Sequence, residues 1–251
     1  MTLFTPAASN RRRVQRVRHE LRRRELRVLR VQPLGAGFVE VIFGGDDLAD
    51  FVSLSFDDHL KFMLPGPDGQ PVRRDYTPRR FDTVRRELSI EFALHGHGAA
   101  SDWARHAAPG QAVQIGGPRG SMIIAMDHDW HLLAGDATAL PAIHRRLEEL
   151  PAGATALVLG LVADAADQRH FDSAANVHLQ WHHDAPAWLA ALRQLQLPAG
   201  EGFAWCAGEA QLMRDARDIL VQQHGLPREA MRVSAYWKHG ASDFHETLES
   251  S

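Results

Sequence analysis

The sequence predicts an N-terminal antiparallel six-stranded β-barrel followed by a C-terminal parallel α/β domain. Its 251 residues, 45% of them hydrophobic, suffice for two cores of about 100–150 residues each. Short alternating segments bounded by glycine or proline fill the first half, whereas apolar runs separated by helical patterns fill the second half. We place the boundary between Ser121 and Trp130, which gives domains at residues 1–125 and 126–251.

Four segments of the first half have the alternation of antiparallel strands. Each is followed within two residues by glycine or proline, and their spacing is typical of a small barrel or sandwich. Residues 121–129 are then expected to form a strand and the crossover into the second domain. The four expected strands cover residues 38–43, 59–64, 88–94 and 112–115.

The second half alternates apolar runs with longer helical patterns. Pro141 suits the first turn of a helix, and Gly225 suits the end of another. Strands that are followed by helices predict a parallel sheet covered on both faces. We expect strands at residues 130–135, 156–162, 177–181 and 203–207, and helices at residues 140–150, 186–195 and 209–224.

Positive charge is concentrated near the N-terminus, in and just after a basic segment at residues 1–25. Residues 11–30 contain ten arginines against Glu20 and Glu25, a net charge of +8 in a chain whose total is −3, which leaves −11 elsewhere. Such a segment can bind nucleic acid or an anionic surface. Leucine and valine alternate with these arginines, however, as in the approach to a first strand. Because no nucleic-acid-binding signature follows, we expect no nucleic-acid partner.

Composition excludes several other classes. The single cysteine, Cys206, excludes an internal disulfide framework and an iron–sulfur cluster held by four cysteines of this chain. No run reaches the roughly 18 apolar residues of a membrane span, so we expect a cytoplasmic protein without membrane insertion. The 15 histidines lack metal-site spacing, and neither a G-x-S-x-G elbow nor a P-loop is present.

The most informative motif is R-D-Y-T-P-R at residues 74–79. Arginine can fork onto pyrophosphate, an aromatic ring can cover an isoalloxazine, and a hydroxyl can reach the redox-active nitrogen of a flavin. Taken alone, the motif is equally compatible with a basic surface turn around Thr77 and Pro78.

Five further blocks follow in order: LHGHGAASDWA at 94–104, GGPRGS at 116–121, AGDATALPAI at 134–143, AGE at 207–209 and YWKHG at 236–240. Together with residues 74–79, they resemble the siderophore-interacting proteins, which are cytoplasmic FAD-dependent ferric-siderophore reductases of the ferredoxin-reductase-like flavoproteins. The resemblance covers nearly the whole chain. It implies a FAD-binding domain at residues 1–125 and a NAD(P)H-binding domain at residues 126–251.

For FAD, the resemblance places Arg74 on the pyrophosphate, Tyr76 against the isoalloxazine and Thr77 at its polar edge. Arg79 would give a second phosphate or adenine-side contact, with a surface charge as the alternative. His95 is compatible with a flavin-facing or a structural role. A second phosphate cradle would use backbone N–H groups before a helix capped by Ser101, at Gly98, Ala99, Ala100 and Ser101.

For the nicotinamide nucleotide, the resemblance points to the ends of strands in the second domain. Asp136 and Thr138 would border the nicotinamide, with a helix cap as the alternative for Asp136. The family commonly has Glu at position 137, where this chain has Ala. Gly208 and Glu209 would allow close approach of the nucleotide. His182 and His183 stand where relatives have Arg near the ribose, so both NADPH and NADH stay open as donors.

The resemblance implies a ferric siderophore as substrate. Lys61, Arg119 and Lys238 would form an anion-binding pocket, and Trp237 would cover the flavin; solvated charges and a packing Trp are the alternatives. NAD(P)H would reduce FAD, which would reduce Fe(III) and release Fe(II). Ferredoxin is an alternative donor. The other functions left open are a reductase with a protein or small-molecule acceptor, and a redox-silent siderophore- or nucleic-acid-binding protein.

Overall fold

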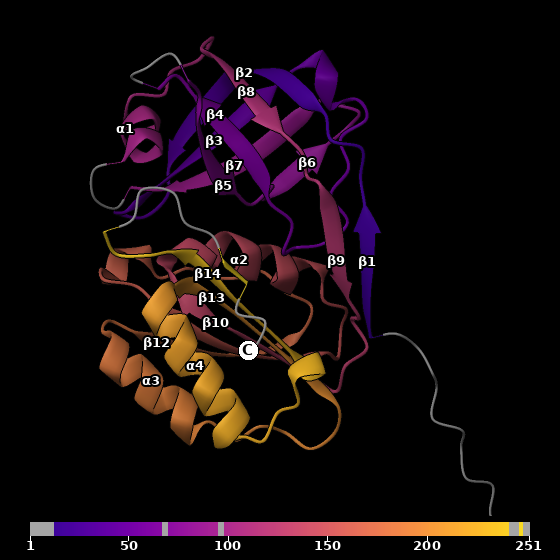
Figure 1. Ribbon diagram of the computed structural model, residues 1–251, viewed down its shortest axis with the longest axis vertical. Coiled ribbons are helices and arrows are strands. Elements are labelled where there is room, and N and C mark those ends of the chain that lie inside the picture. Colours follow the sequence, from indigo (N-terminus) through magenta and orange to yellow (C-terminus); the bar gives the residue numbers. More distant parts are fainter. Residues whose placement is uncertain (1–12, 67–69, 95–97, 241–245, 248–251) are drawn as a thin grey trace, which may run out of the picture.

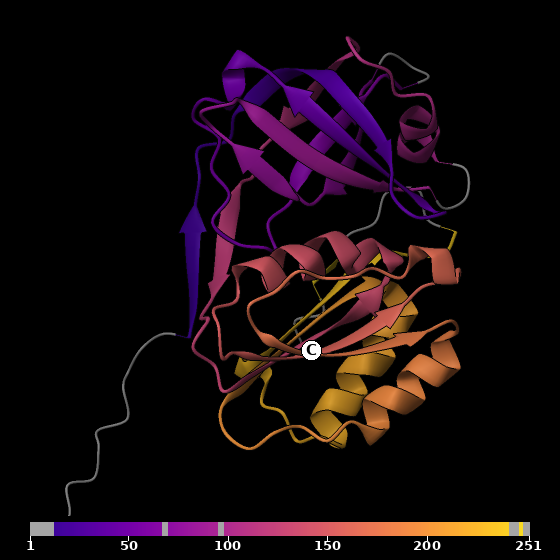
Figure 2. The same cartoon turned by 180° about the vertical axis from the view of Figure 1, so that it is seen from behind.

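The computed structural model describes residues 13–66, 70–94, 98–240 and 246–247. Figures 1 and 2 show two parts, a β-rich N-terminal part and an α/β C-terminal part, in contact along one side. Among the described residues, no helix is long and apolar enough to cross a membrane.

The N-terminal part is a curled, seven-stranded antiparallel sheet in the order β5-β4-β8-β2-β3-β7-β6. The predicted antiparallel, curled architecture is confirmed, with seven strands in place of the predicted six. Residues 77–79 connect the edge strands β5 and β6, and three residues span only about 10–13 Å, so the two edges lie close together. The strands are β2 (Arg23–Pro33), β3 (Phe38–Gly44), β4 (Leu60–Leu64), β5 (Val72–Tyr76), β6 (Arg80–Asp82), β7 (Glu87–Ala93) and β8 (Ala112–Gly116).

Alternation along these strands fills the inside of the curl with apolar side chains. Leu60, Phe62 and Leu64 of β4 are buried, whereas the intervening residues are half-buried. Helix α1 (Ala99–Arg105) covers one opening, where the Trp103 ring lies 4.8 Å from the Phe62 ring, centroid to centroid.

The C-terminal part is built on a parallel sheet. Its order is β12-β11-β10-β13-β14-β15, in which β15 (Glu246–Thr247) is antiparallel to β14. The order changes direction between β10 and β13, which is the switch point where such sheets bind nucleotides. The parallel strands are β10 (Trp130–Asp136), β11 (Thr155–Leu161), β12 (Asn176–His182), β13 (Gly202–Glu209) and β14 (Met231–Trp237).

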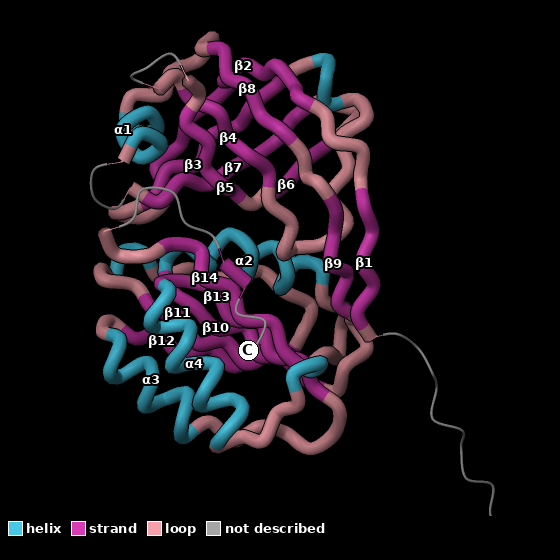
Figure 3. The backbone as a smooth tube through the Cα atoms, viewed as in Figure 1, coloured by secondary structure: helices cyan, strands magenta, loops and turns pink. Residues whose placement is uncertain are grey.

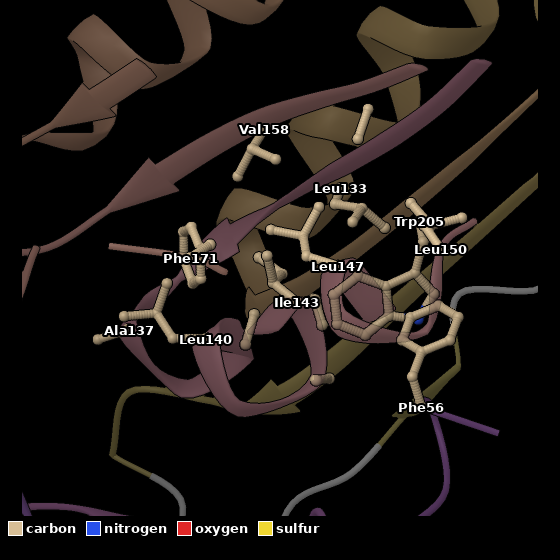
Figure 4. Packing of buried hydrophobic residues seen from close by; sticks show 14 of the residues in the cluster. Phe56, Leu133, Ala137, Leu140, Ile143, Leu147, Leu150, Val158, Phe171 and Trp205 are labelled. Atoms are coloured by element: carbon tan, nitrogen blue, oxygen red, sulfur yellow. The ribbon is translucent and has the colours of Figure 1, made fainter. Parts of the chain in front are cut away.

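Helices cover both faces of this sheet (Figure 3). α2 (Leu140–Glu149) lies between the sheet and the N-terminal part, while α3 (Ala185–Gln194) and α4 (Ala210–Gln222) cover the far face. Figure 4 shows the α2 side of the core, where Leu140, Ile143 and Leu147 pack with the Trp205 and Phe56 rings. Because Phe56 comes from the N-terminal part, this core joins the two parts.

A separate ribbon, in which β1 (Val14–Arg18) pairs with β9 (Gly120–Ile124), carries the described start of the basic segment. Several described arginines of the basic segment form ion pairs. Arg13 contacts Asp127 and Glu201 at 2.7 and 2.8 Å, and Arg24 contacts Asp50 at 2.8 Å. Arg24 belongs to β2, and Arg13 directly precedes β1, so the described part of the basic segment joins folded strands as the alternation of leucine and valine indicated.

Candidate functional site

Strand β5 places the two main residues of the motif on one side. Arg74 and Tyr76 are two residues apart, so their side chains leave the same face of the sheet. The half-buried Tyr76 ring lies 4.4 Å from the Phe92 ring, which also contacts Trp103 of α1. Burial raises the pKa of Tyr76 although the Arg74 charge lowers it, so the hydroxyl stays protonated. The motif and α1 therefore share one side of the curled sheet.

The start of α1 differs from the prediction. The helix begins at Ala99 with Gly98 in extended conformation at the N-cap, and Ser101 lies inside the helix. The Ser101 hydroxyl donates to the Ala93 carbonyl at 3.1 Å, so it does not cap the helix. Glycine serves as an N-cap without a side-chain hydrogen bond, which explains the earlier start. A Cβ at Gly98 would meet no atom of the described residues within 4 Å. His95 lies outside the described residues.

The last residue of the motif has contacts of a different kind. Arg79 is only 2% exposed. Its Nε lies 3.1 Å from Glu91, and its Nη1 and Nη2 donate to the Glu148 carboxylate at 2.6 and 2.9 Å. Burial favours a raised pKa for Glu148, but hydrogen bonds from Arg79 and Arg80 lower that pKa to about 2. These contacts join the curled sheet to α2, and a phosphate contact of Arg79 stays a prediction.

Arg145 of α2, which the sequence did not indicate, holds the turn after Tyr76. Its Nη1 donates to the Pro78 carbonyl at 2.9 Å and to the Ser53 hydroxyl at 2.8 Å. Thr77 is thereby held in a buried position. No local sequence pattern indicates this role of Arg145, because 67 residues separate it from Pro78 and the contact depends on the tertiary fold.

Asp136 ends β10 at the switch point and joins three segments. Its Oδ1 accepts from the Thr138 N–H at 2.9 Å and from the Thr138 hydroxyl at 2.5 Å. Its Oδ2 accepts from the Glu209 N–H at 2.7 Å and from the Trp237 Nε1–H at 2.8 Å. Burial raises the pKa of Asp136, and these hydrogen bonds act to lower it. The cap interpretation is confirmed, since Asp136 caps the turn η2 (Ala137–Ala139).

Gly208 and Glu209 are shaped by this carboxylate. A Cβ at Gly208 would lie 2.6 Å from Asp136 Oδ2, and the φ of Gly208 is +155°. Glycine is therefore required here by Asp136 itself. Glu209 caps α4, because its side chain accepts from the Gln211 and Leu212 N–H groups at 2.6 and 3.0 Å. Trp237 remains 40% exposed beside this cluster.

Of the three predicted cations, Lys61 has a carboxylate partner that the sequence analysis did not use. Its Nζ lies 2.8 Å from Asp75 Oδ2, and the two residues are directly opposite on β4 and β5. Arg119 and Lys238 are exposed. Arg119 follows the turn at Gly117 and Pro118, and Lys238 follows Trp237.

Tyr236 marks the meeting point of the two halves of the site. Burial raises its pKa well above the ordinary value, and the carboxylates of Asp57, Asp75 and Asp136 raise it further, while Arg232 lowers it. Asp75 belongs to β5 and Asp136 to β10, so charges from both parts of the chain act on this tyrosine. Asp57 Oδ1 also accepts from the Trp205 Nε1–H at 2.8 Å across the interface.

At the end of β12, the His183 Nδ1 lies 3.0 Å from the Val162 carbonyl oxygen. Among the described residues, no group of three or more His, Cys, Asp or Glu side chains is arranged to hold a metal ion.

Comparison with known proteins places this arrangement among relatives. Residues 66–122 match the siderophore-interacting FAD-binding domain, and residues 128–240 match the siderophore-interacting protein family. The NADPH-dependent ferric-chelate reductase of Escherichia coli K12 is 37% identical over 246 residues, which cover 89% of this chain and 96% of that protein. The ferric vibriobactin reductase ViuB of Vibrio cholerae is 28% identical over 251 residues, covering 89% and 93%.

Solved structures agree with these sequence matches. A siderophore utilization protein from T. fusca has a TM-score of 0.85 and 34% identity, covering 92% of this chain and 98% of that chain. Phthalate dioxygenase reductase has a TM-score of 0.61 at 16% identity, covering 88% and 70%, and thus shares the fold. From the 37% identity over 89% of its length and the two domain matches in order, the chain belongs to the siderophore-interacting protein family.

Proposed function

We propose that this chain is a ferric-siderophore reductase that uses FAD and NAD(P)H. The observation that carries the proposal is that helix α2 connects two strand ends, because it follows the turn that Asp136 caps and its Arg145 and Glu148 bind Pro78 and Arg79 after Tyr76. One is the R-x-Y-T strand β5, and the other is the nucleotide-binding edge of the parallel sheet at Asp136. In this arrangement, a flavin on β5 would lie next to a nicotinamide at the switch point.

The residues on the β5 side fit FAD. Arg74 offers a planar donor fork for pyrophosphate, and Tyr76 offers a half-buried aromatic ring on the same face. Thr77 follows at a turn that Arg145 holds in place. We expect a phosphate to bind at the start of α1, near the backbone of Gly98, Ala99, Ala100 and Ser101. Bound FAD would supply the chemistry, because it accepts hydride and releases single electrons.

The residues at the switch point fit a nicotinamide nucleotide in a different manner from that predicted. Asp136 already accepts four hydrogen bonds from the protein, so we assign it a positioning role. Thr138, which is half-buried, and Trp237, which is exposed, are the groups that a ligand can reach. The E. coli relative is named NADPH-dependent, so we expect NADPH as donor, with NADH and ferredoxin as the alternatives to test.

A ferric siderophore brings its own oxygen ligands, so the protein has to supply orientation and charge. We expect Lys61, Arg119 and Lys238 to contact the chelate. Reduction to Fe(II) weakens the hold of hard oxygen donors and releases the metal.

Flavin content tests the β5 assignment. We expect Arg74→Ala to lower the FAD retained per chain at least about tenfold, because a charge-assisted fork contributes roughly 1.5–3 kcal/mol. Arg73→Ala is the matched control, since Arg73 is exposed on the opposite face of the same strand. Absorbance of the purified protein gives the ratio of flavin to chain. Full flavin content in Arg74→Ala, or equal losses in both variants, would contradict the assignment.

Anaerobic stopped-flow spectroscopy tests the reaction itself. NADPH, NADH and reduced ferredoxin are mixed in turn with the flavoprotein, and bleaching of the flavin identifies the donor. The reduced protein is then mixed with ferric chelates and with non-iron acceptors. Reoxidation by ferric chelates supports the proposal; reoxidation only by other acceptors identifies a different reductase, and absence of bleaching identifies a redox-silent protein.

A further inference from the structure

Lys61, one of the three cations expected at the substrate site, is paired with a carboxylate of the protein itself. Lys61 and Asp75 face each other across β4 and β5, with Nζ and Oδ2 2.8 Å apart. The Lys61 side chain is 41% exposed, whereas that of Asp75 is 17% exposed. Adjacent opposite charges largely cancel at a distance, so this pair attracts an anionic ligand less than a lone lysine would.

The ion pair with Lys61 uses only one oxygen of the Asp75 carboxylate. Its second oxygen, Oδ1, is buried and has no hydrogen-bond partner among the described residues. An unsatisfied buried acceptor costs stability, and local costs of this kind concentrate at functional sites.

We propose that Asp75 is a specificity-determining residue that masks the Lys61 charge and thereby selects ferric chelates of low net charge over strongly anionic ones. The inference rests on the proposed function. Its physical basis is electrostatic repulsion, because a carboxylate beside the chelate disfavours the ligand with the larger negative charge.

The charge of the chelate provides the test. Asp75→Asn keeps the shape of the side chain and an oxygen that can accept from Lys61, but it removes the charge. We expect kcat/KM for a ferric tris-catecholate, which is strongly anionic, to rise about fivefold, as unmasking one partly exposed charge contributes up to about 1 kcal/mol. For a neutral ferric tris-hydroxamate, kcat/KM should change less than about twofold. Added salt should shrink the gain.

Three variants control this result. Glu87→Gln removes a carboxylate of β7 that pairs with Arg30 of β2 at 3.1 Å. This variant should leave the chelate preference unchanged. Lys61→Ala combined with Asp75→Asn should abolish the catecholate gain, since no masked lysine remains. Asp75→Ser gives the same test if Asp75→Asn does not retain FAD.

The outcomes separate the two claims. If the wild-type flavoprotein reduces no ferric chelate, the proposed function is wrong. If it reduces ferric chelates but the neutral Asp75 variants leave the catecholate-to-hydroxamate ratio of kcat/KM unchanged, the masking role of Asp75 is overturned.

Discussion

Replacing Asp136 by Asn should destabilise the protein far more than replacing an ordinary helix cap. The carboxylate accepts two hydrogen bonds on each oxygen, from Thr138 on one side and from Glu209 and Trp237 on the other. Asparagine retains one acceptor oxygen, so its NH₂ group faces either the Glu209 and Trp237 donors or Thr138, whose hydroxyl can turn to accept while its N–H loses its acceptor. Each stranded buried donor costs about 1–3 kcal/mol. Relief of the buried charge offsets part of this, so we expect a net loss of up to about 3 kcal/mol.

For a chain of this size, a loss of that order lowers Tm by about 6–12 °C. Urea denaturation followed by tryptophan fluorescence measures the free energy of unfolding directly. Asp184→Asn is the matched control, because exposed Asp184 caps α3 with a single bond from the Ala187 N–H at 2.8 Å. Asparagine caps nearly as well as aspartate, so this control should lose less than about 0.5 kcal/mol. Equal losses in the two variants would refute the reasoning.

Two more predictions concern the same part of the molecule. Gly208→Ala would place a methyl group 2.6 Å from Asp136 Oδ2 and should lower the free energy of unfolding by about 1–3 kcal/mol. Gly153→Ala is the control, because Gly153 also has a positive φ but its Cβ would meet no described atom within 4 Å, and it should cost less. Urea denaturation of both variants makes the comparison. Burial and then the Arg146 charge lower the pKa of His131 from 6.5 to about 4, so the unfolded chain binds a proton there before the native state does. The free energy of unfolding is therefore unaffected by His131 titration above pH 6.5. It falls by about 1.4 kcal/mol per pH unit as the pH drops from 6.5 to about 4. His131→Gln should flatten this dependence, and an unchanged slope would contradict the assignment.

The order of elements followed from the sequence because hydrophobic periodicity and glycine or proline boundaries are local signals. The expected helices at 140–150 and 186–195 match α2 and α3 within one residue at each end. Several strands were absent from those expected, and for β6 and β14 the physical reason is clear. β6 has only three residues after Pro78, too few to show alternation, and the parallel strand β14 has no clear boundary at its start.

The chemistry of individual site residues was harder to predict than their presence. Arg79 and Arg74 are indistinguishable in the motif, yet Arg79 pairs with Glu148, 69 residues away. Lys61 appeared as a lone cation because its partner Asp75 is opposite on another strand. Such pairings depend on register and on packing between elements, and neither is visible in a single sequence.

Helix α2 links the two halves of the site mechanically. It begins directly after η2, the turn that Asp136 caps, and its last turns carry Arg145 and Glu148. These two side chains hold Pro78 and Arg79, which follow Tyr76 at the end of β5. Ten helical residues span about 15 Å, so one rigid element sets the separation between the switch point and the R-x-Y-T strand. We therefore expect Arg79 to act on the flavin site through the position of its neighbours, which would account for a buried arginine within this motif.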